Sequence, residues 1–319
     1  MIDMILNNIF YVLVFPGFLF ACFAGLLLAG IDRKIVARMQ KRVGPPILQP
    51  FYDFMKLLGK ETIIPHAAAK RIFLAAPVVG LVSLIVTGMF IPVGGVALFN
   101  TTADIVVIIY LLIIPAVSII VGGAASGSPY AGVGLSREMV AVVSYELPFI
   151  MILLAIAKKV GGDGGMTFAF ADITAWQTAH GVLIGQWALI PAALAMLLVI
   201  PAEVGSHPFD IAEAETEICE GTLVEYSGAP LAVYELSHAV KMFIMTALFT
   251  ALFLGGITTG IVVLDVVIFL AICVVVTVLC MSLIHAITAR LKVEVLFRFY
   301  WKIVTGLALL SLILVWLGL

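Results

Sequence analysis

Charge is scarce in this sequence. Only 11% of its 319 residues are charged, whereas 63% are hydrophobic. Soluble domains carry roughly 25% charged residues, so the shortage excludes an ordinary soluble protein. No basic patch of the kind that binds nucleic acid stands out, and nucleic acid is not an expected partner. The composition instead predicts an integral membrane protein that is surrounded by the lipid bilayer.

Cysteine is sparse as well. The four cysteines, Cys22, Cys219, Cys273 and Cys280, are scattered without a C-x-x-C pair, and the five histidines are equally dispersed. An iron–sulfur cluster or a structural zinc site needs several such ligands at close spacing. The sequence therefore predicts no metal and no cofactor within this chain. No nucleophile–histidine–acid arrangement appears either, so no catalytic residue is expected.

Long apolar runs dominate what is present. A helix crosses a bilayer with about 20 apolar residues, and eight runs are long enough. They occupy roughly residues 4–30, 72–96, 103–123, 138–157, 181–201, 236–256, 261–286 and 299–317. The first run is not read as a secretory signal peptide, because no basic segment precedes it. We predict an all-α integral membrane protein with about eight transmembrane helices, forming a single membrane domain over residues 1–319.

The basic residues predict the orientation. The first connection carries Arg33, Lys34, Arg38, Lys41, Arg42, Lys56, Lys60, Lys70 and Arg71, and the seventh carries Arg290, Lys292 and Arg298, whereas the second and sixth carry no Lys or Arg. Cytoplasmic loops are enriched in Lys and Arg. We therefore expect a multi-pass protein of the plasma membrane with both termini outside. A basic loop (residues 31–71) and an acidic loop (residues 201–235) then face the cytoplasm.

The basic loop has a predicted helix of its own. Apolar side chains recur at helical spacing over residues 47–59, which predicts a short amphipathic helix at the membrane surface. The basic residues alone would suit topology control and binding of anionic lipid. That account does not explain Gln49, Asp53 and Glu61, which are interspersed among them. A docking surface for a partner protein is the alternative, and both interpretations stay open.

The most acidic stretch covers residues 201–228. Its seven carboxylates are Glu203, Asp210, Glu213, Glu215, Glu217, Glu220 and Glu225, and no Lys or Arg follows before Lys241. A solvated loop fits poorly, because apolar residues are interleaved with the acids. If residues 209–220 are helical, Glu213, Glu217 and Glu220 share one face. Like charges at that spacing raise one another's pKa values and titrate as a group, which is the chemistry of a proton reservoir.

Two predicted spans carry ionisable residues at bilayer depth. In the fourth, Glu146 has the stronger functional claim, because Glu138 could instead pair with Arg137 or cap the helix. A charge at the bilayer centre costs at least about 2.5–3.5 kcal/mol, so Glu146 should face protein or water. Another span begins with Glu235, His238 and Lys241 at intervals of three, which places them on one broad helical face. His238 suits an interhelical hydrogen bond or a proton relay equally well.

Three motifs resemble one known family. They are ARMQKRVGPPILQPFYDFMKLLGKE, SREMVAVVSYE and EVGSHPFDIAEAETEICEGTLVEYSG, which starts at Glu203. They are similar to the family of membrane subunit 1, also called the H subunit, of NADH:quinone oxidoreductase, respiratory complex I, along the whole chain. In that family the subunit joins the peripheral redox arm to the membrane arm, contributes to the quinone chamber and starts an acidic path along the membrane.

The resemblance implies a role for particular residues. Asp210, Glu213, Glu215, Glu217 and Glu225 stand where the family has chamber-lining carboxylates, and Glu203 and Glu146 stand in its acidic path. Together with the ionisable residues singled out above, the expected proton path comprises Glu138, Glu146, Glu203, Asp210, Glu213, Glu215, Glu217, Glu220, Glu225, Glu235, His238 and Lys241. The expected contacts to the peripheral arm are Arg38, Arg42, Gln49, Asp53, Lys56 and Glu61.

Departures from the family pattern indicate which branch of the family the chain resembles. The first-loop motif is shortened to RVGPPILQP, Ser206 stands where the family has an arginine before x-PFD, and His238 replaces a glutamate. These changes put quinone binding in doubt. The shortened form looks like the homologous subunit of membrane-bound, energy-converting nickel–iron (NiFe) hydrogenases and their sulfur-reducing or formate-hydrogenlyase relatives.

The function expected from the resemblance is that of a non-catalytic anchor and coupling subunit in a hetero-oligomeric oxidoreductase. It links redox chemistry in peripheral subunits, which hold Fe–S clusters and in the hydrogenase type a NiFe centre, to H+ or Na+ movement through antiporter-like membrane subunits. A quinone-chamber subunit and a stand-alone ion transporter remain alternatives. A purely structural anchor is the plain interpretation of every carboxylate above.

Overall fold

The computed structural model describes residues 10–96, 98–99, 101–162, 165–257 and 259–318, without the side chains of Glu215 and Thr216. Eight helices in these residues are long and apolar enough to cross a membrane, which confirms the predicted fold class. They are Phe10–Met39, Lys70–Phe90, Asp104–Ser126, Pro129–Gly161, Trp187–Val204, Gly228–Leu254, Val262–Ile287 and Val293–Trp316. No strand occurs in the described part of the chain, where Val93 and Val96 form one isolated bridge.

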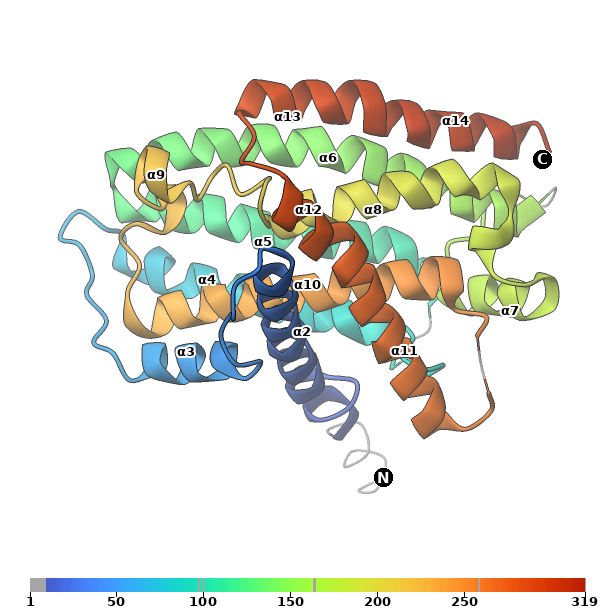
Figure 1. Cartoon of the computed structure of the whole chain (residues 1–319), viewed down its shortest axis with the longest axis horizontal. Coiled ribbons are helices and arrows are strands. Elements are labelled where there is room, and N and C mark those ends of the chain that lie inside the picture. Colours follow the sequence, from blue (N-terminus) through green and yellow to red (C-terminus); the bar gives the residue numbers. More distant parts are fainter. Residues whose placement is uncertain (1–9, 97, 100, 163–164, 258, 319) are drawn as a thin grey trace.

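The individual elements carry the labels of Figure 1. The long helices are α2 (Phe18–Met39), α4 (Lys70–Phe90), α5 (Asp104–Ser126), α6 (Pro129–Gly161), α8 (Ile190–Val204) and α10 (Gly228–Leu254). The last two spans are each interrupted by a π-helical turn: α11 (Val262–Thr277) continues through Val278–Ser282 into α12 (Leu283–Ile287), and α13 (Val293–Phe299) continues through Tyr300–Val304 into α14 (Thr305–Trp316). The shorter helices are α3 (Gln49–Leu58), α7 (Phe170–His180) and α9 (Glu215–Ile218).

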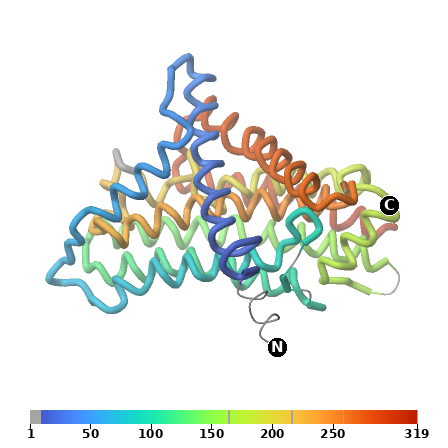
Figure 2. The backbone as a smooth tube through the Cα atoms, turned by 90° about the horizontal axis from the view of Figure 1, so that it is seen from below, coloured from blue at the N-terminus to red at the C-terminus, as the bar shows by residue number. Residues whose placement is uncertain are grey.

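Helix α10 lies at the centre of the bundle. In its most apolar window 94% of the residues are buried, against 28% for the span that contains α11. It packs against α2, α4, α8 and α11. In Figure 1, α4, α6, α8, α10 and α14 run lengthwise, while α2 and α11 cross them obliquely. Figure 2, turned by 90°, shows α2 and α11 projecting as a wedge from one side of this layer. Side chains of α10 are therefore the natural lining of any internal site.

The odd-numbered connections meet at one end of the bundle, which we call the rim (residues 40–69, 127–128, 205–227 and 288–292). Three hydrogen bonds join them: Ala69 N to Ala125 O at 2.9 Å, Leu291 N to Pro208 O at 3.2 Å, and Ile63 N to Ser227 Oγ at 2.9 Å. At the opposite end, the Phe170 amide donates to Asp104 at 3.1 Å and the Gly256 amide donates to Gln177 at 2.8 Å. The basic and acidic loops thus share one end.

Helix ends extend further toward the rim than hydropathy indicates. Helix α2 continues to Met39, α6 begins at Pro129 and α10 begins at Gly228. Hydropathy misses these ends because they carry charged and small residues. Several residues of the expected loops, Asp32 and Glu235 among them, therefore lie within helices. The predicted amphipathic helix is present as α3, and its Phe51 packs against Phe23 of α2 with the ring centroids 5.6 Å apart.

The condition that residues 209–220 form one helix is not met. Only α9, four residues long, is helical there, so Glu213, Glu217 and Glu220 share no helical face. Cys219 and Glu220 have φ values of 51° and 69°, in the left-handed region where a right-handed helix cannot continue. The interleaved apolar residues do turn inward, since Phe209, Ile211 and Ile218 are buried. Packing of these side chains holds the loop in a non-helical path.

Close packing of α2 on α10 predicts a stability effect. A Cβ at Gly25 would lie 2.5 Å from the Ala239 carbonyl oxygen of α10, whereas one at Gly306 of α14 would meet nothing. We expect Gly25→Ala to destabilise the assembled protein by about 1–3 kcal/mol, the cost of overpacking. Gly306→Ala, the matched control, should be neutral or stabilising, because alanine is the better helix former. Thermal unfolding in detergent measures both, and equal midpoints for the two variants would contradict the packing.

Candidate functional site

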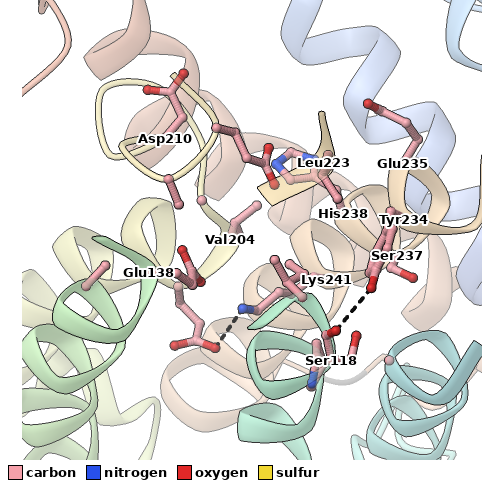
Figure 3. A pocket seen from close by; sticks show the side chains of 18 of the residues that line it. Ser118, Glu138, Val204, Asp210, Leu223, Tyr234, Glu235, Ser237, His238 and Lys241 are labelled. Carbon is pink, nitrogen blue, oxygen red and sulfur yellow. Dashed lines mark hydrogen bonds and ion pairs between the residues drawn. The ribbon is translucent and has the colours of Figure 1, made fainter. Parts of the chain in front are cut away.

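A cavity of about 180 Å³ lies between α10, the rim ends of α6 and α8, and the acidic loop. Its titratable lining residues are Arg33, Glu138, Glu203, Asp210, Glu213, Tyr234, Glu235, His238 and Lys241. Figure 3 shows Glu138 and Lys241 on opposite sides of this space, with Asp210 and Glu235 further out. Ionisable groups from distant parts of the sequence are therefore brought to one chamber.

Helix α10 supplies one wall of the cavity. Glu235, His238 and Lys241 all line it, as their spacing of three residues predicts. Tyr234 comes from the same helix and donates its hydroxyl to the Ser118 carbonyl of α5 at 3.0 Å. This bond fixes the rim end of α10 against α5. The three ionisable side chains are thereby held in position on a buried helix.

A buried ion pair lies in the wall of the cavity. Lys241 Nζ is 3.0 Å from Glu203 Oε1, and the two side chains are only 9% and 1% exposed. Beyond this pair, neither oxygen of Glu203 has a hydrogen-bond partner in the described part of the chain. Removing one member of such a pair leaves an uncompensated buried charge. The pair therefore fixes α10 to α8 and is sensitive to any change in charge nearby.

Two further carboxylates of α6 interact electrostatically with this pair. Glu138 lines the cavity, and both Glu138 and Glu146 interact with Glu203 and Lys241. Oε2 of Glu146 is buried and has no partner among the residues described. If all three carboxylates were ionised, the single ammonium would leave two negative charges uncompensated at membrane depth, which is costly. The cluster can therefore exchange protons in response to a small change in its surroundings.

Glu213 lies at the rim side of the same cavity. Burial, aided by the neighbouring carboxylates with Glu138 first among them, raises the pKa of Glu213 from 4.5 to about 8. The side chain is therefore largely protonated at neutral pH. It is suited to gaining or losing a proton within the physiological range.

Other acids at the rim are held by arginines. Asp210 accepts two hydrogen bonds from Arg290, at 3.0 Å from Nε and 2.5 Å from Nη2. Glu217 lies 2.6 Å from Arg137 Nη1, so Arg137 pairs with Glu217 and the alternative pairing with Glu138 is not formed. The bidentate contact of Arg290 fixes the geometry of Asp210. These contacts make Asp210 and Glu217 ties between loops, while Glu138 remains turned into the cavity.

The first loop contributes a third ion pair that links separate segments of the chain. Asp53 of α3 lies 3.2 Å from Arg33 of α2 and accepts a hydrogen bond from Gln49 at 2.8 Å. Arg33 lines the cavity as well, so this ion pair connects the basic loop to the site. The other expected interface residues, Arg38, Arg42, Lys56 and Glu61, are exposed on the rim. They are accessible to a partner protein.

The remaining expected path residues lie outside the cavity lining. Glu220 is exposed and Glu225 is half-buried. The side chain of Glu215 lies outside the described residues. Sequence reasoning did not assign Arg33, Tyr234 or Arg290 to the site. Arg290 is 80 residues from Asp210 in the sequence, and no local pattern could have indicated this pairing.

The chain is similar to known proteins over most of its length. The family described as NADH dehydrogenase matches residues 10–316. The H subunit of the NADH-quinone oxidoreductase of Bordetella petrii is 33% identical over 240 residues, which cover 72% of this chain and 67% of that protein. For the same subunit of Bordetella pertussis the identity is 34% and the coverage 70% and 66%, so the chain spans about two-thirds of that relative. The corresponding subunit of Neorickettsia sennetsu is 30% identical over 338 residues, covering 99% of this chain and 97% of that protein.

A solved structure matches over the whole fold. It is that of the membrane-bound sulfane sulfur reductase, an archaeal respiratory membrane complex, with a TM-score of 0.86, 27% identity, and coverage of 98% of this chain and 99% of the other. Fold and relatives together define a multi-pass membrane subunit of a complex-I-related respiratory oxidoreductase, which works as part of a hetero-oligomer. The chain belongs to the NADH dehydrogenase family, as a homologue of the H subunit of NADH-quinone oxidoreductase. The resemblance read from its motifs is confirmed.

The buried ion pair generates a stability prediction. Lys241→Met should destabilise the assembled protein by about 3–5 kcal/mol, because the Glu203 carboxylate is left buried without a counter-ion. The double variant Lys241→Met/Glu203→Gln removes both charges and should recover most of the loss. Thermal unfolding of the purified complex measures the cycle. Additive effects of the two substitutions would show that the pair is not coupled.

The raised pKa of Glu213 predicts a pH dependence. The folded protein binds this proton more tightly than the unfolded chain, so its free energy of unfolding should fall as pH rises from about 4.5 to about 8. Glu213→Gln, which mimics the protonated form, should flatten that decline and exceed the parent protein in stability above pH about 8. The exposed Glu220 supplies the control variant, Glu220→Gln. If the unfolding midpoints of Glu213→Gln and Glu220→Gln fall equally steeply as pH rises, the raised pKa of Glu213 is contradicted.

Proposed function

We propose that this subunit couples redox chemistry in docked peripheral subunits to the movement of H+ or Na+ by neighbouring antiporter-like membrane subunits. The proposal rests on the buried ion pair of Lys241 and Glu203, which lines the same cavity as Glu138 and Glu213. A charge or conformational change at the rim would alter the proton occupancy of this cluster. Electrons remain in the Fe–S proteins, and in the hydrogenase type also at a NiFe centre.

The rim is the proposed docking surface for the peripheral subunits, facing the cytoplasm with both termini outside. Its exposed Arg38, Arg42, Lys56 and Glu61 provide charged contacts. The positive-inside rule supports the orientation, because the rim gathers the basic connections. The Arg33–Asp53 pair then gives a direct link from the docking surface to the cavity wall.

The half of α10 beyond Lys241 supports proton transfer to neighbouring subunits in the plane of the membrane, and not across the membrane through this chain. Beyond Lys241 this helix offers only the hydroxyls of Thr246 and Thr250, and both donate to backbone carbonyls within α10. The surrounding residues are buried and apolar, with Phe243, Phe249 and Phe253 among them. A proton has no ionisable group to bind along this helix toward the opposite end. We therefore assign ion translocation to partner subunits and not to a stand-alone carrier.

A quinone chamber is the second candidate. A cavity of about 200 Å³ between α2, α3 and α10 shares Arg33, Glu235 and His238 with the first cavity. A quinone headgroup could approach the acidic cluster by this route. The departures at Ser206 and His238 weigh against it. Quinone that copurifies with the complex, or inhibition by quinone-site ligands, would favour this candidate.

The coupling role predicts a loss of ion translocation in a charge variant. Glu203→Gln in the assembled, reconstituted complex should retain redox turnover but lose most of the ions moved per electron, because one acid of the cluster can no longer exchange a proton. Glu138→Gln, which leaves the ion pair intact, should act in the same direction. Ion uptake per electron in proteoliposomes is the measurement.

A surface glutamate supplies the control for this experiment. Glu294 is 85% exposed and lies 3.8 Å from Arg298. Glu294→Gln should leave the ion-to-electron ratio unchanged. An unchanged ratio in both cavity variants, with the subunits assembled, would refute the coupling role and leave a purely structural anchor.

A further inference from the structure

Asp32 is an acid that the proposed path does not use. It lies on α2, half-buried, and its Oδ1 accepts a hydrogen bond of 2.6 Å from Ser282 Oγ in the π-helical turn before α12. Its neighbour Arg33 is paired with Asp53 instead. The Ser282 hydroxyl therefore orients the Asp32 carboxylate, and no bidentate ion pair with an arginine holds it among the described residues.

Two histidines stack on each other where the acidic loop meets α12. The rings of His207, in the acidic loop, and His285, on α12, have centroids 4.8 Å apart and planes within 9° of parallel. His285 follows Ser282 by three residues and so shares its helical face, toward α2 and Asp32. Nδ1 of His207 is buried without a hydrogen-bond partner in the described residues. The pair bridges the rim loop and the helix that contacts Asp32.

The same groups are coupled electrostatically as far as the cavity. Asp32 interacts with His285, with Arg33 and with His238 on the cavity wall. His238 in turn interacts with Asp32, Asp210, Arg33 and Lys241. A succession of titratable groups thus runs from the rim, through α12 and α2, to α10. Its members come from four separate segments of the chain.

The more direct route from the rim is blocked. Asp210 lines the cavity, but Arg290 holds it in a bidentate pair. Both carboxylate oxygens of Asp210 are thus engaged by one guanidinium. Asp210 therefore ties the acidic loop to the seventh connection, although it lies between the rim and the cavity. The histidine pair and Asp32 provide a route around it.

We propose that His207, His285 and Asp32 form a proton-uptake line that delivers protons from the rim to His238 in the cavity, a deepening that rests on the coupling function proposed above. A proton from bulk water binds an imidazole of the stacked pair and moves to the Asp32 carboxylate. Asp32 then releases it to the His238 imidazole. Each group returns to its starting state, so one proton leaves the water and one arrives in the cavity.

Local structure suits each step of this transfer. Burial lowers the pKa of His207, and the adjacent His285 and Arg290 lower it further against the opposing effect of Asp210. At neutral pH its ring is therefore uncharged and able to accept a proton. The π-helical turn Val278–Ser282 shifts the helical register immediately before α12. Such turns are frequent at functional sites, and this one precedes the face that carries His285.

The test is Asp32→Asn in the complete reconstituted complex. We expect proton uptake coupled to turnover to slow by at least about tenfold at alkaline pH, where free protons are scarce, because a general acid–base group contributes roughly 100-fold or more. Added formate or azide, small weak acids that carry protons, should restore the rate. Glu294→Gln is the control, because it removes an exposed carboxylate that lies off this line.

Further variants separate transfer from structure. Ser282→Ala keeps the carboxylate and should slow uptake less than Asp32→Asn, while His285→Gln should reproduce the alkaline defect. Unchanged alkaline uptake in an assembled Asp32→Asn complex, or a defect that weak acids do not restore, would overturn the proposal. If Glu203→Gln abolishes ion translocation while Asp32→Asn has no effect, the uptake line fails and the coupling role stands. If Glu203→Gln has no effect, the coupling role itself fails.

Discussion

The buried pair of Lys241 and Glu203 is the constraint on which the rest of the site depends. An ammonium and a carboxylate that are almost fully withdrawn from water must stay in contact, because separating them costs several kcal/mol per ion. This requirement holds α10 against α8. The same helix carries Glu235 and His238, which line the same cavity.

Pairing divides the acidic residues into two groups with different chemistry. Asp210, Glu217 and Asp53 are held by arginines and connect the loops of the rim to one another and to the helices. Glu138 and Glu213 turn into the cavity without such a partner and can change their proton occupancy. The first group ties the loops of the rim together. The second group is the part of the site that would change its proton occupancy in the proposed coupling role.

Residue patterns predicted the spans and the shared helix face, but they did not predict the path of the acidic loop or the long-range ion pairs. Apolar runs gave the eight spans because lipid requires them, and the spacing of Glu235, His238 and Lys241 gave their shared face because a helix imposes it. The loop over residues 209–220 followed tertiary packing of its apolar side chains instead of helical periodicity. The partner of Asp210 could not be predicted, since Arg290 belongs to a distant connection. Long-range pairing of charges requires the fold itself.

The half of α10 beyond Lys241 has an apolar interior, which supports the proposal that ions cross the membrane through neighbouring subunits. Charge can collect at the rim end of α10, but Phe249 and Phe253 fill the interior beyond Lys241, and the two threonines there already donate to their own helix. A proton that reached Lys241 would have to return to the rim or leave sideways through α4, α5 or α6. A stand-alone carrier would need an ionisable path on both sides of its binding site. The arrangement instead suits a subunit that accumulates and releases charge at one end of the membrane, next to other membrane subunits that carry the ion across.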